Sequence, residues 1–219
     1  MGEKQPEELI AYVRERLQNF HPHAVRRVEI PKPDGRMRPL GIPTMEDRII
    51  QQCIKQVLEP ICEAKFYKHS YGFRPNRSAH HAIARAMFLV NISKYRYVVD
   101  VDIKGFFDNV DHGKLLKQLW TLGIRDKQLL CVLSKMLKAP IQGEGMPTKG
   151  VPQGGILSPL LSNVVLNELD WWISSQWGTF PTKTNYTHDL SRYQNLRRTS
   201  RMKEIFIVRY ADDFKLFCK

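Results

Sequence analysis

The sequence predicts an α+β fold, in which helices are segregated from a small, mostly antiparallel sheet. Two observations support this class. Apolar residues recur at helical spacing in several long segments, and short β-rich stretches bounded by turn residues lie between them. The regular alternation of strand and helix that builds a doubly wound sheet is absent, and so is the phosphate-binding pattern G-x-x-x-x-G-K-[ST].

The N-terminal part of the chain predicts helices and one basic hairpin. Each predicted helix carries its apolar residues on one face, and a turn at Pro33-Asp34-Gly35 joins two strands. Lys32, Arg36 and Arg38 lie around the tip of this hairpin. The expected elements are a helix over 7–20, strands over 25–31 and 37–42, a helix over 45–60 that Pro60 ends, and a helix capped by Ser78 that runs to about 91.

The C-terminal part predicts the rest of the sheet and three more helices. The expected elements are a strand over 95–103, helices from Asp111 to about 122 and from 125 to about 137, a glycine-rich hairpin connection over 143–155, a long helix from Ser158 to about 177, and a hairpin around Asp212. Residues 178–204 are polar, basic and weakly periodic. They predict either a mobile solvated loop or an RNA-binding insertion in which aromatic and basic side chains interleave.

The charge balance favours a polyanionic partner. The chain has 219 residues, and 34 Lys and Arg against 22 Asp and Glu give a formal charge of 34 − 22 = +12. Its four cysteines form no C-x-x-C pair and lie in apolar surroundings, which favours buried free thiols in a reducing compartment. No apolar run reaches the roughly 18 residues of a membrane span and no signal peptide is recognised, so a cytoplasmic location is expected.

The most informative motif is Tyr210-Ala211-Asp212-Asp213, which lies between two apolar stretches near the end of the chain. The pattern predicts a strand, a tight turn and a second strand, with both acids at the tip. Side chains alternate along a strand, so two neighbouring aspartates cannot both point into a core. Adjacent like charges repel unless a cation lies beside them, which favours a divalent metal over an ordinary surface turn.

A second group of acids lies at the end of the strand over 95–103. Asp100 and Asp102 are two positions apart and therefore share a face of that strand. Carboxylates at a strand end beside an acidic hairpin are typical of sites where two Mg²⁺ ions clamp the oxygens of a phosphoryl transfer. Other roles are open: Asp100 can pair with a basic side chain, Asp108 and Asp111 can cap a helix, and Asp102 taken alone favours neither reading.

The third motif is the segment Gly150-Val151-Pro152-Gln153-Gly154-Gly155, which precedes the long predicted helix. Paired glycines let a backbone approach a ligand closely, and a helix offers free N–H groups at its start. By composition alone, a plain junction between a loop and a helix is the better explanation of this segment.

The motifs together closely resemble those of the reverse transcriptases encoded by group II introns, from about Val25 to the end of the sequence. The matching segments are 38–43 and 69–78 for two fingers motifs, 102–108 for motif A, 152–160 for motif B and 210–213 for motif C. Five motifs in this order and at compatible spacing are very specific. The resemblance implies a right-hand polymerase with fingers over 1–94 and a palm over 95–219, the latter including the insertion 178–204.

The resemblance also implies roles for individual residues. Asp102 and Asp212 would be the main ligands of two Mg²⁺ ions, for which Mn²⁺ can substitute, with Asp213 beside them and the Ile103 carbonyl as a further oxygen ligand. The other residues are implied to bind substrates. Lys32, Arg38, Gln153 and Gly154 would hold the incoming nucleotide, Phe106 or Phe107 (with Phe107 favoured) would exclude a ribose 2′-hydroxyl, Arg74, Asn76 and Arg77 would follow the template, and Arg197 and Arg198 would contact RNA.

The implied function is that of an RNA-directed DNA polymerase of a mobile group II intron, with dNTPs, an RNA template, intron RNA and a DNA primer or target as partners, in a bacterial or organellar-type ribonucleoprotein. The alternatives are a splicing cofactor (maturase) that binds RNA without chemistry, and a related viral replicase, retron or diversity-generating enzyme. Family members continue past motif C into a thumb, so the chain is expected to be a fingers–palm fragment. It is expected to show weak or no processive synthesis, and self-association through exposed surface.

Overall fold

The computed structural model describes residues 5–31, 35 and 37–219, which belong to two compact units. Unit 1 comprises residues 1–65 and 105–164, and unit 2 comprises residues 66–104 and 165–219. Each unit is thus built from two separate stretches of the chain. The division into residues 1–94 and 95–219 that the resemblance implied is of another kind, and it stays a prediction.

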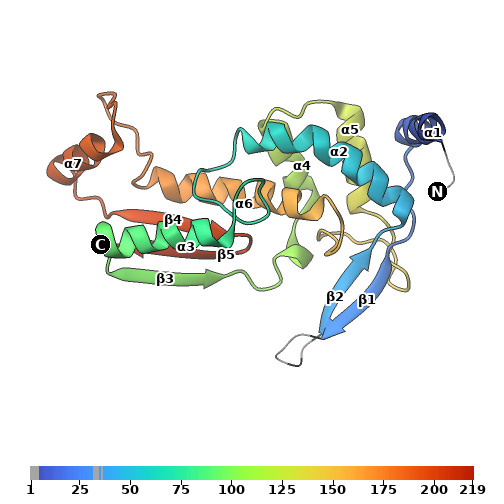
Figure 1. Ribbon diagram of the computed structural model, residues 1–219, viewed down its shortest axis with the longest axis horizontal. Helices are drawn as coiled ribbons and strands as arrows, with labels where there is room; N and C mark the ends of the chain where they lie inside the picture. Colours follow the sequence, from blue (N-terminus) through green and yellow to red (C-terminus); the bar gives the residue numbers. More distant parts are fainter. Residues whose placement is uncertain (1–4, 32–34, 36) are drawn as a thin grey trace. The chain divides into compact units, whose positions relative to one another are not determined.

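Unit 1 combines helices with one antiparallel hairpin (Figure 1). Its main elements are α1 (Pro6–Gln18), β1 (Arg26–Pro31), β2 (Met37–Ile42), α2 (Met45–Glu63), α4 (His112–Thr121) and α5 (Lys127–Leu137). All six were predicted, with small differences at their ends. Thr44, Asp111 and Asp126 cap three of the helices, and each side chain accepts a hydrogen bond from the backbone N–H three residues on.

The prediction that Pro60 ends a helix is wrong, because α2 continues through it to Glu63. A proline removes only one hydrogen bond from a helix, so its cost can be offset by packing. Leu58 and Cys62 are four residues apart on one face and both are fully buried. Their burial holds the last turn of α2 against the core.

Unit 2 contains an antiparallel sheet with strand order β3-β5-β4 (Figure 1). Its elements are α3 (Ala79–Met87), the π-helical turn η1 (Phe88–Ile92), β3 (Tyr97–Asp102), α7 (Asp189–Thr199), β4 (Ile205–Tyr210) and β5 (Asp213–Cys218). The helix α6 (Ser158–Ser175) begins in unit 1 and ends in unit 2. Both faces of β4 are covered, because Val208 packs in one hydrophobic cluster and Ile207 in another.

Helix α7 lies within the segment 178–204, where no regular element was predicted. The Tyr193 ring stacks on that of Trp177 with 6.0 Å between the ring centres, and it meets the Phe206 ring edge to face at 5.6 Å between centres. Leu196 is buried in the same cluster. These contacts fix the helix although most of its surface is polar. The alternative of a mobile solvated loop is therefore wrong for this stretch.

The cysteines and the hydropathy of the helices partly match expectation. All four cysteines are free thiols, but only Cys62 is buried, and Cys131 is exposed on the outer side of α5. The expectation of burial fails at Cys131 because the neighbouring Val132 and Leu133 are the residues that α5 turns inward. Among the described residues, no helix is both long enough and apolar enough to cross a membrane.

Candidate active site

Three aspartates meet at one end of the unit 2 sheet. Asp102 is the last residue of β3, and it pairs in register with Asp213, the first residue of β5. Asp212 lies in the two-residue turn that joins β4 to β5. Directly opposed residues on antiparallel strands have Cβ atoms about 4.5–5.5 Å apart. The strand register therefore brings together the acids of motifs A and C, as the sequence predicted.

The charges of this group are only partly compensated. Asp100 lies two residues before Asp102 on β3, and its carboxylate pairs with the Lys215 ammonium at 2.6 Å. Asp102, Asp212 and Asp213 have no ion-pair partner within the described part of the chain. Burial and then the negative charges of Asp212, Asp102 and Asp100 raise the pKa of Asp213 above its ordinary value. A cation that bound here would relieve this repulsion.

The donor set suits a hard cation that brings further ligands of its own. Among the described residues, no group of three or more His, Cys, Asp or Glu side chains is placed so that it could hold a metal ion. Mg²⁺ is commonly held by one or two carboxylates together with water and substrate phosphates, so an incomplete protein shell is what it requires. The aspartates, with the Ile103 carbonyl next to Asp102, fit that requirement.

A buried ion pair supports the turn that carries Asp212. The guanidinium of Arg209 on β4 donates to both carboxylate oxygens of Asp170 on α6, at 2.7–3.0 Å, and both side chains are buried. Burial raises the pKa of Asp170, and the Arg209 guanidinium opposes that rise. A further N–H of Arg209 donates to the Ala211 carbonyl at 2.7 Å. Ala211 adopts the left-handed conformation at φ 58°, which is costly for alanine, and this bond helps to hold it there.

The segment around Gly72 braces the same turn from the other side. Residues 69–71 run beside β4: the Arg209 N–H donates to the His69 carbonyl, and the Tyr71 N–H donates to the Arg209 carbonyl at 2.9 Å. A Cβ atom on Gly72 would lie 2.2 Å from the Ala211 nitrogen. Glycine is therefore needed here for close backbone contact with the turn.

Gly72→Ala is expected to lower the free energy of unfolding by about 1–3 kcal/mol, because the added methyl must push the turn away. Gly113→Ala is the matched control, since a Cβ there meets only an Asp111 carboxylate oxygen at 3.3 Å. The control lies in the first turn of α4, where the Asp111 side chain can give way to the added methyl, so its stability should change little. Urea denaturation of both variants measures the difference, and equal stability of the two would contradict the close approach.

The residues expected to follow the template have different positions. Arg74 is buried and donates to the carbonyls of Tyr67 and Ser70 at 2.8 and 2.9 Å, so its side chain holds this segment together and is not a surface contact. Asn76 is exposed, at φ 57°, and Arg77 is half-buried over the ring of Tyr71. The expected template contact does not fit Arg74, and it stays a prediction for Asn76 and Arg77.

The two arginines predicted to contact RNA on α7 also differ. Arg197 donates two hydrogen bonds to the Glu204 carboxylate, at 2.7 and 2.8 Å, and Tyr95 donates a third at 2.5 Å. Burial alone would raise the pKa of Glu204, but these bonds outweigh it and lower the pKa. Both residues are exposed, but Arg197 is committed to this ion pair, and the predicted contact of Arg198 with RNA stays a prediction.

His69, in the segment 69–71 that runs beside β4, stays neutral in the folded chain. Burial, and then the charges of Arg85, Lys68 and Arg77, lower its pKa from 6.5 to about 3. Below pH 6.5 the histidine binds a proton in the unfolded chain but not in the folded chain. The free energy of unfolding is therefore unaffected by His69 above pH 6.5, and it falls as the pH is lowered from 6.5 towards 3.

When the pH is lowered from about 7 to about 5, His69 is expected to lower the free energy of unfolding by about 2 kcal/mol. Urea denaturation at the two pH values measures the loss, which should largely disappear in His69→Gln. His81→Gln, at an exposed position of α3, is the matched control and should keep the wild-type pH dependence. A loss of equal size in the His69 variant would show that other groups cause it.

The residues expected to hold the nucleotide belong to unit 1. The Gly41 N–H donates to the Gln153 carbonyl at 2.7 Å, and a Cβ on Gly154 would lie 2.8 Å from the Gly41 carbonyl oxygen. The glycine-rich segment therefore packs directly on β2, where Arg38 pairs in register with Ile30. Gln153 is half-buried and Gly154 is exposed. Lys32 lies outside the described residues.

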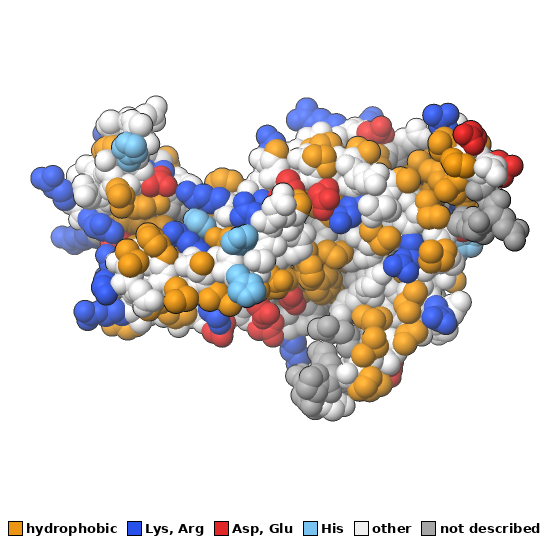
Figure 2. Space-filling model, viewed as in Figure 1, with side chains coloured by type: hydrophobic (Ala, Val, Ile, Leu, Met, Phe, Trp, Pro, Cys, Tyr) orange, Lys and Arg blue, Asp and Glu red, His pale blue; other side chains and the backbone are white. Residues whose placement is uncertain are grey.

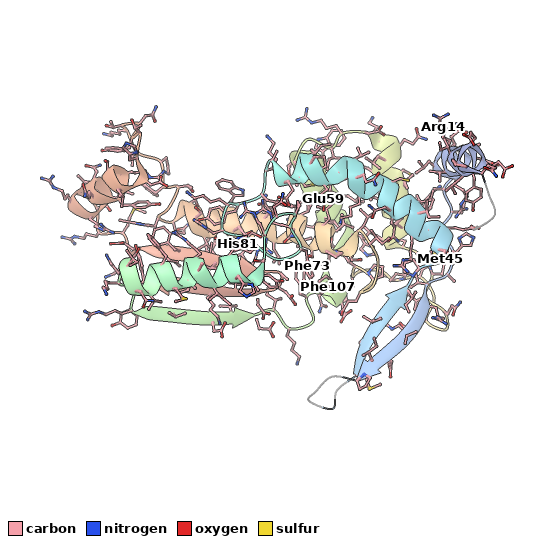
Figure 3. The ribbon with its side chains drawn as sticks, viewed as in Figure 1. Arg14, Met45, Glu59, Phe73, His81 and Phe107 are labelled. Atoms are coloured by element: carbon pink, nitrogen blue, oxygen red, sulfur yellow. The ribbon has the colours of Figure 1, made fainter. Side chains whose placement is uncertain are left out.

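The phenylalanine pair resolves into one core residue and one accessible residue. Phe106 is buried, whereas Phe107 begins the short turn η2 (Phe107–Asn109) and is half-buried (Figure 3). The Phe107 carbonyl accepts a hydrogen bond from the Val151 N–H at 2.7 Å, which ties motif A to the glycine-rich segment. This accessibility supports Phe107 over Phe106 as the predicted contact with the sugar.

The comparisons with known proteins agree with this architecture. The family model of the reverse transcriptase (RNA-dependent DNA polymerase) matches residues 30–219. Protein YkfC of Escherichia coli K12 is 37% identical over 213 residues, which cover 92% of this chain and 56% of YkfC. A solved structure of telomerase from Candida albicans superposes with a TM-score of 0.57 at 14% identity, covering 97% of this chain and 41% of that one, and shows the fold alone.

The chain belongs to the reverse transcriptase family. Within that family it is of the group II intron reverse transcriptase and maturase type. Group II intron-encoded protein LtrA of Lactococcus lactis is 43% identical over 158 residues, covering 70% of this chain and 26% of LtrA. The putative COX1/OXI3 intron 1 protein of Saccharomyces cerevisiae is 33% identical over 84% of this chain and 22% of its own length. The chain spans about half the length of YkfC and about a quarter of LtrA.

Sequence reasoning missed the residues that support the acids. Neither Arg209, in the strand before the turn, nor Asp170, in the long helix, was singled out. A signal was present, because strand alternation gives Arg209 the same side as Ile205 and Ile207, which face the core. A charged residue at an inward position requires a buried partner.

Proposed function

We propose that the chain carries the polymerising site of an RNA-directed DNA polymerase encoded by a group II intron. The observation that carries the proposal is the pairing of Asp102 with Asp213 beside Asp212, three carboxylates at one sheet end without a cationic partner among the described residues. The substrates are an RNA template, a DNA primer and dNTPs. Asp102, Asp212 and the Ile103 carbonyl hold two Mg²⁺ ions, for which Mn²⁺ can substitute, and Asp213 adds to their negative field.

The residues of the chain bind and position the reactants. When bound, the divalent cations activate the primer 3′-hydroxyl and neutralise charge on the leaving pyrophosphate. Lys32 and Arg38 hold the triphosphate of the incoming nucleotide, because guanidinium and ammonium groups bind phosphate oxygens strongly. The Gln153-Gly154 backbone lies along the nucleotide, and Phe107 rejects ribonucleotides by contact with their 2′-hydroxyl.

The test is addition of a single nucleotide to a DNA primer annealed to an RNA template. Scoring one addition separates the chemistry of the site from processive synthesis. We expect addition of a dNTP in the presence of Mg²⁺ and none in EDTA, with the matching ribonucleotide used at least about tenfold less well. Addition that persists in EDTA would sink the metal assignment. RNA binding without any addition would instead favour a splicing cofactor.

A further inference from the structure

Unit 2 contains a second candidate site at the end of its sheet opposite the acids. A cavity of about 600 Å³ is bordered there by residues from several elements. Tyr95 precedes β3, Phe206 lies near the start of β4, and Lys219 follows β5. A six-residue strand is about 17 Å long, so this cavity and the aspartates lie at opposite ends of the strands.

The cavity has one basic side chain whose charge is uncompensated. Lys68 pairs with Asp189 at 3.3 Å, and both Arg197 and Lys219 pair with Glu204. Arg85, on α3, has no carboxylate partner among the described residues, and its Nε is buried without a hydrogen-bond partner. Lys and Arg side chains also gather on the surface around α7, at the left of Figure 2. An anion that entered the cavity would therefore find a free guanidinium in a positive field.

Aromatic rings flank that guanidinium. The Arg85 guanidinium carbon lies 5.4 Å from the centre of the Phe88 ring and 5.8 Å from that of Phe206. Phe206 belongs to the core, but the side chain of Phe88 is 47% exposed. It begins the π-helical turn η1, which the Ser93 N–H closes by donating to the Phe88 carbonyl at 3.0 Å. Such turns are rare and are frequently found at functional sites.

We propose that this cavity binds one nucleotide of single-stranded RNA, with its phosphate on Arg85 and its base against Phe88. A basic side chain beside an exposed aromatic ring is how single strands are bound without reading their sequence. The volume lies within the range of small-molecule sites, which is ample for one nucleotide. An acidic peptide would use the guanidinium but leave the exposed ring of Phe88 without a planar partner.

The inference rests on the proposed function only in taking RNA as the source of the nucleotide. Binding is therefore measured in EDTA, where no polymerisation occurs, with a fluorescent single-stranded oligouridylate. Arg85→Gln is expected to weaken binding by about tenfold, the usual effect of losing one charge-assisted hydrogen bond. Arg125→Gln, an exposed position between α4 and α5, removes the same charge elsewhere and should bind like the wild type. Equal affinity of both variants would overturn the proposal.

Two further measurements on the wild type do not depend on the folding of a variant. An oligonucleotide that carries a photoreactive uridine should crosslink to the peptide that contains Phe88, and crosslinks confined to other peptides would contradict the site. Uridine monophosphate, but not uridine, should compete with the oligonucleotide if phosphate and base are both bound. If uridine monophosphate bound as tightly as the oligonucleotide does per nucleotide, the ligand would be a free nucleotide, and the assignment to RNA would be overturned.

The outcomes separate this site from the polymerising site. Asp212→Asn should leave oligonucleotide binding in EDTA unchanged, since the turn lies at the other end of the sheet. If the wild type added nucleotides but formed no crosslink to the peptide that contains Phe88, the second site alone would be refuted. Crosslinking that persists in a chain without nucleotide addition would refute the proposed activity alone.

Discussion

Asp212→Asn is expected to lower the rate of single-nucleotide addition by about a thousandfold, the size of effect seen when a group that stabilises transition-state charge is removed. The substitution removes one negative charge with almost no change of shape. Asp212 is half-buried in a turn whose conformation asparagine also adopts readily, so stability should change little. The measurement is the rate at saturating Mg²⁺ and dNTP, which separates weak metal binding from lost chemistry.

Asp100→Asn is the matched control for that prediction. Asp100 lies on the same face of β3 as Asp102, but its carboxylate is paired with Lys215 at 2.6 Å. Because Lys215 already neutralises this carboxylate and no metal ligation is assigned to it, this variant should lose no more than about fivefold in rate. If Asp100→Asn were as inactive as Asp212→Asn, general loss of negative charge would explain both results, and the specific role of Asp212 would be refuted.

Asp170→Asn is expected to lower the free energy of unfolding by about 3–5 kcal/mol, because it leaves the buried Arg209 guanidinium without a counter-charge. Urea denaturation measures the loss. Glu59→Gln, which breaks the partly exposed pair of Lys55 and Glu59 on α2, is the control and should cost less than about 0.5 kcal/mol. Equal effects of the two variants would contradict a buried, charged pair.

The double variant Asp170→Leu/Arg209→Met separates stability from support of the turn. Replacing both charges with apolar side chains should recover much of the stability, as it commonly does for buried pairs. The Ala211 carbonyl nevertheless loses its donor, so the turn that carries Asp212 is less well held. We therefore expect nucleotide addition to stay reduced although the fold is restored. Full recovery of the rate would show that Arg209 serves stability alone.

The sequence predicted the elements whose patterns are strongly periodic, because burial of one face dominates their folding. Helices α2, α4 and α5 and all five strands lie within a few residues of the predicted ranges. Helix α7 was not predicted, since few of its residues are apolar and its position depends on Tyr193 packing against Trp177. That contact joins parts of the chain whose proximity no local pattern reveals.

The candidate site divides in the same way. The positions of Asp102, Asp212 and Asp213 could be predicted, because the residues next to them in sequence indicate where the strands end and where the turn lies. The register that opposes Asp102 to Asp213 depends on hydrogen bonds between distant strands, so only the structure provides it. Arg74 has the residue type of a template contact, yet it is buried, because its donors satisfy carbonyls of its own segment.

The discontinuous make-up of the two units has a consequence for synthesis of the chain. All residues of unit 1 exist once position 164 has been made, whereas unit 2 waits for its last two strands. Asp102 and Asp213 are 213 − 102 = 111 positions apart, a delay of roughly 5–20 s at the usual 5–20 residues per second of translation. During that interval β3 has no partner strand, although Tyr97, Val98 and Val99 give it an apolar, pairing-competent edge. The nascent chain therefore carries an unpaired apolar strand, which can pair with other chains, until the aspartates meet.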